Sequence, residues 1–330
     1  MKKRVIGIIL AVMIMLSVFV ITPNNTVEAA TTTETCWTVK SFNSKDHWDI
    51  DGAKTKSNWK FTGQWIKKKV NGSYKWFLKN TKTGKLMDGF VVCSSGTYYL
   101  DSKNGMYTNK IFTCGNTDGS FYFADSSGKI AINQFKKTTK LVNTTKTAKV
   151  QQIYYFGADG ASYSKWNKIN GKYYYFSDYE AKYDGNNGIL FGRNAAYRQI
   201  NNIEDSIFEI NGKKYSFTTG GVMRTGWIQN GKNYYFAQAD GALKSPGWQK
   251  INNKWYYFDQ YWTRVYSCRQ TISGKTYLFG SDGVMQTNTW EKVNSSWYYY
   301  GADGAMLKNT SKKIGNKVYK FNKNGVCTNP

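Results

Sequence analysis

Hydrophobic and polar positions in the C-terminal third of this 330-residue chain follow a pattern that repeats every 21 residues. Each unit runs from an aromatic opening through a turn, an aromatic run and a second turn to a short stretch of small and apolar residues. A fixed period over several units indicates one supersecondary unit used repeatedly. The five clearest units begin at Gly226, Gly247, Cys268, Thr289 and Thr310.

Two turn signals divide each unit, as Asn230-Gly231 and Asp240-Gly241 do in the first of the five. Such dipeptides tolerate the positive φ that two-residue hairpin turns require. The aromatic runs between the turns, such as residues 255–258, are rich in strand-forming side chains. We therefore predict one β-hairpin and one connecting loop for each unit.

A single hairpin of this size is at best marginally stable, whereas hairpins stacked in series bury one another's aromatic rings. The predicted fold class is an all-β, elongated solenoid of stacked β-hairpins with a repeat of about 21 residues. Alternate strand residues face opposite ways, so Trp255 and Tyr257 share one face and Tyr256 and Phe258 the other. One face can fill the interior, and the other can line grooves between hairpins.

The period continues toward the N-terminus with interruptions. We expect repeats over 64–330, interrupted at about 136–149 and 177–205. The first interruption contains five lysines and no acidic residue, and we predict a long, mobile, cationic loop there. The segment 30–63 is too short to be a domain, so we expect a cap or linker at the start of the stack.

The first 29 residues have the pattern of a secretory signal peptide. A basic start precedes an apolar run from Val5 to Ile21, and the small residues Val27 and Ala29 suit cleavage after Ala29. An uncleaved membrane anchor is the alternative, because a run of 17 residues approaches the length of a bilayer span. No second run of this kind follows in the sequence, so we expect no membrane span after cleavage.

The chain is strongly basic, with a formal net charge of +25, and residues 226–330 hold 14 Lys and Arg against five Asp and Glu. A field of this sign attracts anionic polymers. For a secreted protein, the teichoic acids of a Gram-positive wall are a nearer target than nucleic acid, which we do not expect as a partner. The alternative is that the lysines only keep an aromatic-rich surface soluble.

Five cysteines cannot all form pairs. Cys93 and Cys114 lie 21 residues apart, at the same place in consecutive repeats, and could face each other. A secreted protein can form such a disulfide. Buried free thiols are the equal alternative. The sequence contains no C-x-x-C pair, so a zinc or redox motif is unsupported.

The sequence offers little for catalysis. His47 is the one histidine, and any Ser-His-Asp triad would have to use it. Zinc-protease, phosphate-loop and dinucleotide motifs are absent. Asp46, Asp49 and Asp51 only weakly suggest a calcium loop, because the regular spacing and the final Glu are missing, and a polar turn is favoured. We predict no catalytic residues, no metal, no cofactor and no enzyme.

Several motif positions recur together: Gly-Trp at 247–248, Trp-Tyr-Tyr-Phe at 255–258 and Asp-Gly-Ala-Met at 303–306, with Asn-Gly-Lys at 230–232. This pattern resembles the cell-wall-binding repeat superfamily of Gram-positive bacteria, which includes choline-binding modules, glucan-binding repeats and the repeats of large clostridial toxins. The resemblance covers roughly 64–330. It implies a hairpin solenoid that binds wall polymers or carbohydrate in grooves between adjacent repeats.

In the choline-binding branch, the resemblance implies an aromatic cage with two rings from one hairpin and one from the next, which attract the ammonium by cation–π interaction. The two tryptophan positions are intact in only two of the five units, and these are not adjacent, so general glucan or wall-glycan binding is favoured over choline. The same rings could simply form the core. The implied ligand-binding residues are Trp227, Trp248, Trp255, Tyr256, Trp290, Trp297 and Tyr298.

The sequence thus predicts a secreted, non-catalytic binding protein at the cell wall or surface of a Gram-positive bacterium. Its expected partners are teichoic acid, peptidoglycan, glucan or other glycans, held without covalent attachment. Two alternatives stay open. One is an adhesin or toxin-like repeat protein that binds host glycans, and the other is the accessory targeting module of a wall or glucan hydrolase.

Overall fold

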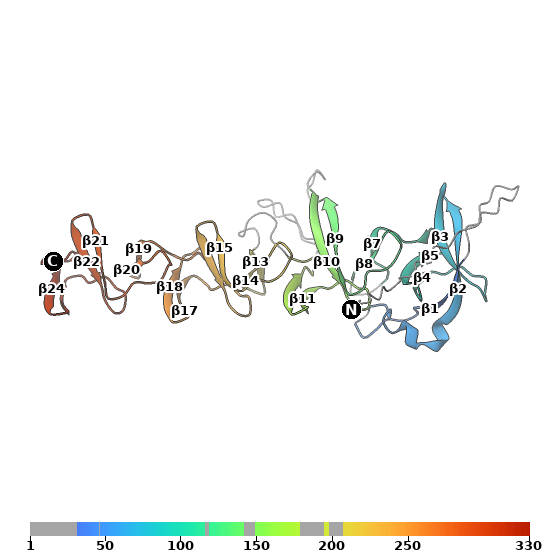
Figure 1. Ribbon diagram of the computed structural model, residues 1–330, viewed down its shortest axis with the longest axis horizontal. Helices are drawn as coiled ribbons and strands as arrows, with labels where there is room; N and C mark the ends of the chain where they lie inside the picture. The colour runs from blue at the N-terminus through green and yellow to red at the C-terminus, as the bar shows by residue number, and fades with distance from the viewer. Residues whose placement is uncertain (1–31, 46, 116–118, 142–148, 179–194, 198–206) are drawn as a thin grey trace, which may run out of the picture. The chain divides into compact units, whose positions relative to one another are not determined.

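A computed structural model describes most of the chain after the expected signal peptide, and Figure 1 colours it by residue number. The chain divides into two compact units. Unit 1 comprises Met1–Thr138 and Tyr154–Tyr163, and unit 2 comprises Thr139–Ile153 and Ser164–Pro330. Among the described residues, no helix is long and apolar enough to cross a membrane. The described residues are 32–45, 47–115, 119–141, 149–178, 195–197 and 207–330.

The predicted all-β fold of repeated hairpins is confirmed. In the C-terminal part of unit 2, each sequence unit forms one two-stranded antiparallel sheet whose first strand begins where the 21-residue period begins. The hairpins are β15–β16 (Gly226–Asn230, Asn233–Ala237), β17–β18 (Gly247–Ile251, Lys254–Phe258), β19–β20 (Cys268–Ile272, Lys275–Phe279), β21–β22 (Thr289–Val293, Ser296–Tyr300) and β23–β24 (Thr310–Ile314, Lys317–Phe321).

The turns within the hairpins have the geometry that their residues favour. In the turn between β19 and β20, Ser273 has a φ of 49° and Gly274 a φ of 80°. Positive φ at both central residues matches the right-handed twist of the flanking strands. The loop after each hairpin then bonds to the hairpin before it, as when the Met285 amide donates to the Trp255 carbonyl at 2.8 Å. These bonds link successive hairpins of unit 2 in series.

Unit 1 contains a larger sheet of six strands in the order β3-β2-β1-β4-β5-β6. β1 pairs antiparallel with both β2 and β4, so the segment expected to be a cap contributes a strand between the first two hairpins. The boundary expected between residues 63 and 64 falls inside β2. The strands are β1 (Thr33–Thr38), β2 (Lys60–Val70), β3 (Ser73–Asn80), β4 (Gly89–Cys93), β5 (Thr97–Asp101) and β6 (Gly105–Met106), and two 3₁₀ turns, η1 (Ala53–Thr55) and η2 (Ser57–Trp59), precede β2.

The disulfide joins Cys36 to Cys93, so the pairing of Cys93 with Cys114, one of the two alternatives left open by the sequence, is wrong. Cys36 lies directly opposite Cys93 in the register of β1 and β4. The repeat spacing could not reveal this, because the partner lies on a strand from outside the periodic part. Cys114 is a buried free thiol, and burial raises its pKa to about 12.

The first interruption of the period is partly strand rather than loop, contrary to the prediction. β9 (Gln134–Leu141) and β10 (Lys149–Phe156) form a two-stranded sheet, so residues 136–141 continue a strand and 142–148 lie outside the described residues. Most of the second interruption also lies outside them. The remaining hairpins are β7–β8 (Lys110–Phe112, Tyr122–Ala124), β11–β12 (Lys165–Ile169, Lys172–Phe176) and β13–β14 (Ile207–Ile210, Lys213–Ser216).

Candidate aromatic binding sites

Trp248 and Trp255 face each other across one hairpin. Trp248 lies on β17, and Trp255 on β18 pairs with Lys250, two residues further along β17. Two residues along a strand return to the same face, so the tryptophans are diagonal neighbours on that face. Their ring centroids are 6.3 Å apart and their planes stand at 89°. The two rings therefore form adjacent walls of a corner.

A third ring comes from the next hairpin. The Tyr277 ring on β20 lies 4.7 Å from the Trp248 ring, at 73°. Trp255 keeps 42% of its surface exposed, so the corner is not closed off as core. Two tryptophans and one tyrosine thus meet between adjacent hairpins. We call this group the Trp248 triplet.

The same arrangement recurs two units later. The Trp290 and Trp297 rings are 6.2 Å apart at 89°, and Tyr319 of the following hairpin lies 4.8 Å from Trp290 at 68°. These rings and Pro330 line a cavity of about 400 Å³. Sequence reasoning required intact tryptophan pairs in adjacent units to complete a cage. That requirement was wrong, because the tyrosine of the next hairpin supplies the third ring in both cases.

A third triplet lies in unit 1, where the sequence analysis placed no site. The Trp65 and Trp76 rings are 6.5 Å apart at 88°, and Tyr98 lies 4.9 Å from Trp65 at 73°. They line a cavity of about 210 Å³ together with Met106. Longer strands put the tryptophans 11 residues apart instead of seven, which hid the match. The tyrosine follows the second tryptophan by 22 residues in all three triplets, and this spacing could have revealed it.

A lysine accompanies each triplet. Lys67, Lys250 and Lys292 pair across their hairpins with the second tryptophan of each triplet. Their Nζ atoms lie 4.7, 5.9 and 5.4 Å from the centroids of those rings. Each triplet therefore has a positive charge beside it, where the anionic part of a ligand would be favoured.

Trp227 and Tyr256, both predicted as site residues, lie around an arginine of the chain itself. The Cζ atom of Arg264 is 4.3 Å from the Tyr234 ring centroid and 5.4 Å from that of Trp227. Tyr256 contacts Trp227 at 5.0 Å and takes the place that Tyr277 has in the Trp248 triplet. We call these three rings with Arg264 the Arg264 cluster. A guanidinium already occupies the position that a ligand cation would take.

Tyr298, another predicted site residue, is also covered by an arginine. Arg269 occupies the place of the first tryptophan, and its Cζ atom lies 3.9 Å from the Tyr298 ring centroid. The Nε atom of Arg269 donates to a Glu291 carboxylate oxygen at 2.6 Å, and the Tyr300 hydroxyl donates to the same oxygen at 2.6 Å. Burial and this carboxylate together raise the pKa of Tyr300. The result is an internal ion pair rather than a ligand cage.

One further cluster uses a tyrosine in the second position and contains no arginine. Trp166 on β11 contacts Tyr215 of the next hairpin at 4.9 Å and 66°. Tyr173 holds the second position and is 45% exposed. The Met223 amide donates to the Tyr173 carbonyl at 2.8 Å, and the Arg264 amide donates to the Tyr234 carbonyl in the same way. Apart from methionine in place of arginine, this cluster matches the Arg264 cluster.

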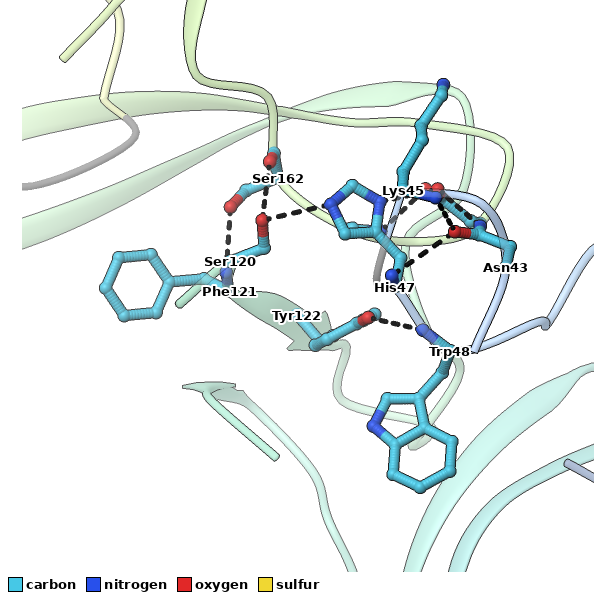
Figure 2. Close-up of polar contacts among 10 residues, drawn as sticks. Asn43, Lys45, His47, Trp48, Ser120, Phe121, Tyr122 and Ser162 are labelled. Atoms are coloured by element: carbon cyan, nitrogen blue, oxygen red, sulfur yellow. Dashed lines mark hydrogen bonds and ion pairs between the residues drawn. The ribbon is translucent and has the colours of Figure 1, made fainter. Parts of the chain in front are cut away.

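His47 takes part in a buried polar network in unit 1, shown in Figure 2. Its Nδ1 lies 2.7 Å from a carboxylate oxygen of Asp159, and its Nε2 lies 3.4 Å from the Ser120 hydroxyl. The chain of contacts from Asp159 through His47 to Ser120 resembles a catalytic triad. However, Ser120 is 3% exposed and His47 9%, so a substrate carbonyl has no access to the serine. The network instead ties the loop before η1 to the turn at Asp159.

Comparison with protein-family models identifies repeats of two related kinds. Residues 267–310 and 287–327 match the choline-binding repeat, and residues 164–178, 225–243 and 247–260 match the cell wall binding repeat. The predicted resemblance to the cell-wall-binding repeat superfamily is confirmed. No curated protein matches the chain.

Several solved structures from Streptococcus pneumoniae are similar to the chain. The modular autolysin LytC, in complex with a synthetic peptidoglycan ligand, is 20% identical with a TM-score of 0.47, over 70% of this chain and 44% of LytC. Choline binding protein F is 20% identical with a TM-score of 0.36, over 81% and 98%. The choline-binding domain of CbpL is 18% identical with a TM-score of 0.31, over 74% and 98%. The match thus spans less than half the length of LytC.

Proposed function

We propose that this protein binds choline groups of cell-wall teichoic acid and thereby attaches, without a covalent link, to the surface of a Gram-positive bacterium. The observation that carries the proposal is the recurrence of one arrangement in three places: two tryptophans at right angles and a tyrosine from the next hairpin. A quaternary ammonium has no hydrogen to donate, so a site selects it by surrounding it with aromatic faces. The matches to choline-binding repeats support the same ligand class.

Charge supports the teichoic acid as the polymer that presents the choline. Teichoic acid is a phosphate-rich polymer, and Lys67, Lys250 and Lys292 lie beside the three triplets. The rings would take the ammonium and the lysine the phosphate. The net charge of +25 would add a long-range attraction for the phosphate-rich polymer, one that salt weakens. We also propose that the protein is secreted and that it has no catalytic activity.

Calorimetric titration with choline chloride tests the proposal, with ammonium chloride at the same ionic strength as the control. We expect binding of choline and none of ammonium, because the smaller, strongly hydrated ion keeps its water. A second titration uses purified walls that contain choline-bearing teichoic acid, and walls stripped of it. Equal binding to both walls, or no heat with choline at millimolar concentration, would refute the proposal.

A further inference from the structure

A wide cavity of about 830 Å³ in unit 2 contains none of the triplets. It is lined by residues of β13, β14 and β16 and by the loop that follows β18. Its volume falls in the range of small-ligand pockets. At the position where the triplets have their second tryptophan, this part of the chain has Lys214. The cavity therefore needs another explanation than choline.

The loop after β18 breaks the repeat pattern at the edge of this cavity. Trp262 has a φ of 69°, in the left-handed region that bulky side chains rarely adopt. The equivalent residue of the other repeats is glycine, with φ between 72° and 84° at Gly241, Gly283, Gly304 and Gly325. Backbone strain of this kind persists where the surrounding structure enforces it, and it is concentrated at functional sites.

Local packing explains how a tryptophan fits at this position. A Cβ atom added at Gly283 would lie 2.4 Å from the Arg264 side chain, and one at Gly304 would lie 2.4 Å from Met285. Trp262 instead packs against the cluster that contains Leu243, a shorter side chain at the corresponding place. Asp259 fixes the turn by accepting hydrogen bonds from the Tyr261 and Thr263 amides, both at 2.9 Å. The loop therefore presents two adjacent aromatic side chains from a rigid turn.

The chemistry of the lining is mixed rather than cationic or anionic. Tyr261 is 72% exposed, so packing does not account for it. Within the described part of the chain, the exposed side chains of Glu209, Asn233 and Gln260 form no hydrogen bonds. They offer a carboxylate and two amides as donors and acceptors. Lys214 pairs with Glu209 across the hairpin, and its Nζ lies 4.8 Å from the Trp262 ring centroid.

From these features we propose that this cavity is a binding site for a neutral oligosaccharide. A pyranose ring has an apolar face of C–H groups that stacks on an aromatic side chain, and hydroxyls around its edge that need hydrogen-bond partners. Trp262 and Tyr261 supply the aromatic surface, and Glu209, Asn233 and Gln260 supply the partners. The site is separate from the triplets and does not depend on choline binding.

The test is calorimetric titration with two tetrasaccharides, β-1,4-linked N-acetylglucosamine and α-1,6-linked glucose, which distinguish a wall-type glycan from a glucan. We expect one of them to bind with one site per chain. Trp262→Gly restores the residue that the other repeats carry and relieves the strained φ, which offsets part of the packing that the substitution removes, so the variant should still fold. Affinity for the sugar should nevertheless fall at least tenfold, and choline binding should not change.

Two further variants make the result decisive. Gln260→Ala removes an exposed side chain and should weaken sugar binding several-fold without affecting the fold. Trp297→Ala removes a triplet ring and should leave sugar binding intact. The proposal is overturned if neither tetrasaccharide binds the unmodified protein, if Trp262→Gly binds as tightly as the original chain, or if only Trp297→Ala loses the sugar. Failure of choline binding with sugar binding retained would refute the proposed function alone.

Discussion

The Trp248 triplet and the Arg264 cluster occupy the same place in successive repeats and differ in what their rings face. In the triplet, the Trp248, Trp255 and Tyr277 rings meet between adjacent hairpins, and Trp255 is 42% exposed. In the cluster, a guanidinium of the chain itself lies against the Trp227 and Tyr234 rings, and Tyr256 contacts Trp227. The same ring positions therefore pack around an arginine in the cluster, whereas within the described residues no arginine lies over the rings of the triplet.

The comparison shows that an aromatic cage alone does not identify a ligand site. The Arg264 side chain donates to the Asp282 carbonyl at 2.6 Å and is 9% exposed, so it is fixed in place. Its Nε is buried and has no hydrogen-bond partner among the described residues. An unpartnered buried donor costs free energy that the cation–π contacts with the surrounding rings offset. In the Arg264 cluster, the residue eight positions after Tyr256 thus occupies the cage, whereas the equivalent residue of the Trp248 triplet is Met285.

Replacing Arg264 by methionine should have the largest effect, because it adds a binding site. Arg264→Met would give the cluster the same four residue types as Trp166, Tyr173, Tyr215 and Met223. We expect one additional choline per chain in calorimetric titration, with folding unaffected or improved, since a buried charge is removed. Arg264→Lys is the matched control, because it keeps a cation between the rings, and it should add no site. An unchanged number of sites in Arg264→Met would contradict the comparison.

A second prediction separates the triplet of unit 1 from those of unit 2. Cys36→Ser with Cys93→Ser opens a loop with a sequence separation of 57 residues, which should lower the stability of unit 1 by about 4 kcal/mol. Hydrogen exchange should then increase in β1–β6 and not in β15–β24. Choline binding should be weakened at the Trp65 triplet alone. Cys268→Ser, at an exposed free thiol, is the control, and equal exchange in both variants would be the contrary result.

A third prediction compares one ring in each setting. Trp255→Ala removes a half-exposed wall of the Trp248 triplet and should weaken that site by about 2 kcal/mol, or roughly thirtyfold. Tyr234→Ala removes the equivalent ring of the Arg264 cluster and should leave every choline site unchanged. Circular dichroism should show the β-spectrum intact in both. Loss of choline binding in Tyr234→Ala would mean that the arginine does not close the cluster.

Sequence reasoning located the hairpins well because their turns and period are local properties. The strand starts at Gly226 and Cys268 follow from turn residues within a few positions. The sites were harder, because a cage depends on which side chain of another repeat reaches it. Trp248 and Trp255 were evident, whereas Tyr277 resembled any other strand tyrosine. The content of a cage depends on packing across repeats, which the pattern within one unit does not reveal.

The features outside the period were the least predictable. Cys36 pairs with Cys93 because a non-repeating strand inserts beside β4, and no spacing rule applies to such an insertion. The contacts of His47 likewise could not be predicted from the sequence. Asp159 lies in a turn, and its carboxylate contacts His47. The aspartates at the same position of other repeats, Asp240, Asp282 and Asp303, are exposed to solvent. Both the disulfide and the burial of His47 thus depend on contacts between a non-repeating segment and the repeats.

The smallest effect should come from replacing the Asp159 carboxylate, and the equivalent aspartate of another repeat provides a matched comparison. Burial acts to raise the pKa of Asp159, but the hydrogen bond and charge of His47 outweigh it and hold the pKa below its ordinary value. A lowered folded-state pKa stabilises the fold above the unfolded pKa of about 3.9, and this contribution is lost as the pH falls through the folded value. Asp159→Asn should therefore cost about 1.5 kcal/mol at pH 7 and less near pH 3.

Asp303→Asn is the control for this substitution. Asp303 accepts a hydrogen bond from the Ala305 amide at 3.1 Å, as Asp159 does from Ala161, but its other oxygen lies 3.7 Å from the exposed Lys275. A surface pair of this kind contributes little, so Asp303→Asn should change stability by less than about 0.5 kcal/mol at any pH. Denaturant unfolding of both variants between pH 3 and 7 measures the difference. Equal, pH-independent losses would show that the turn, and not its contact with His47, is what Asp159 stabilises.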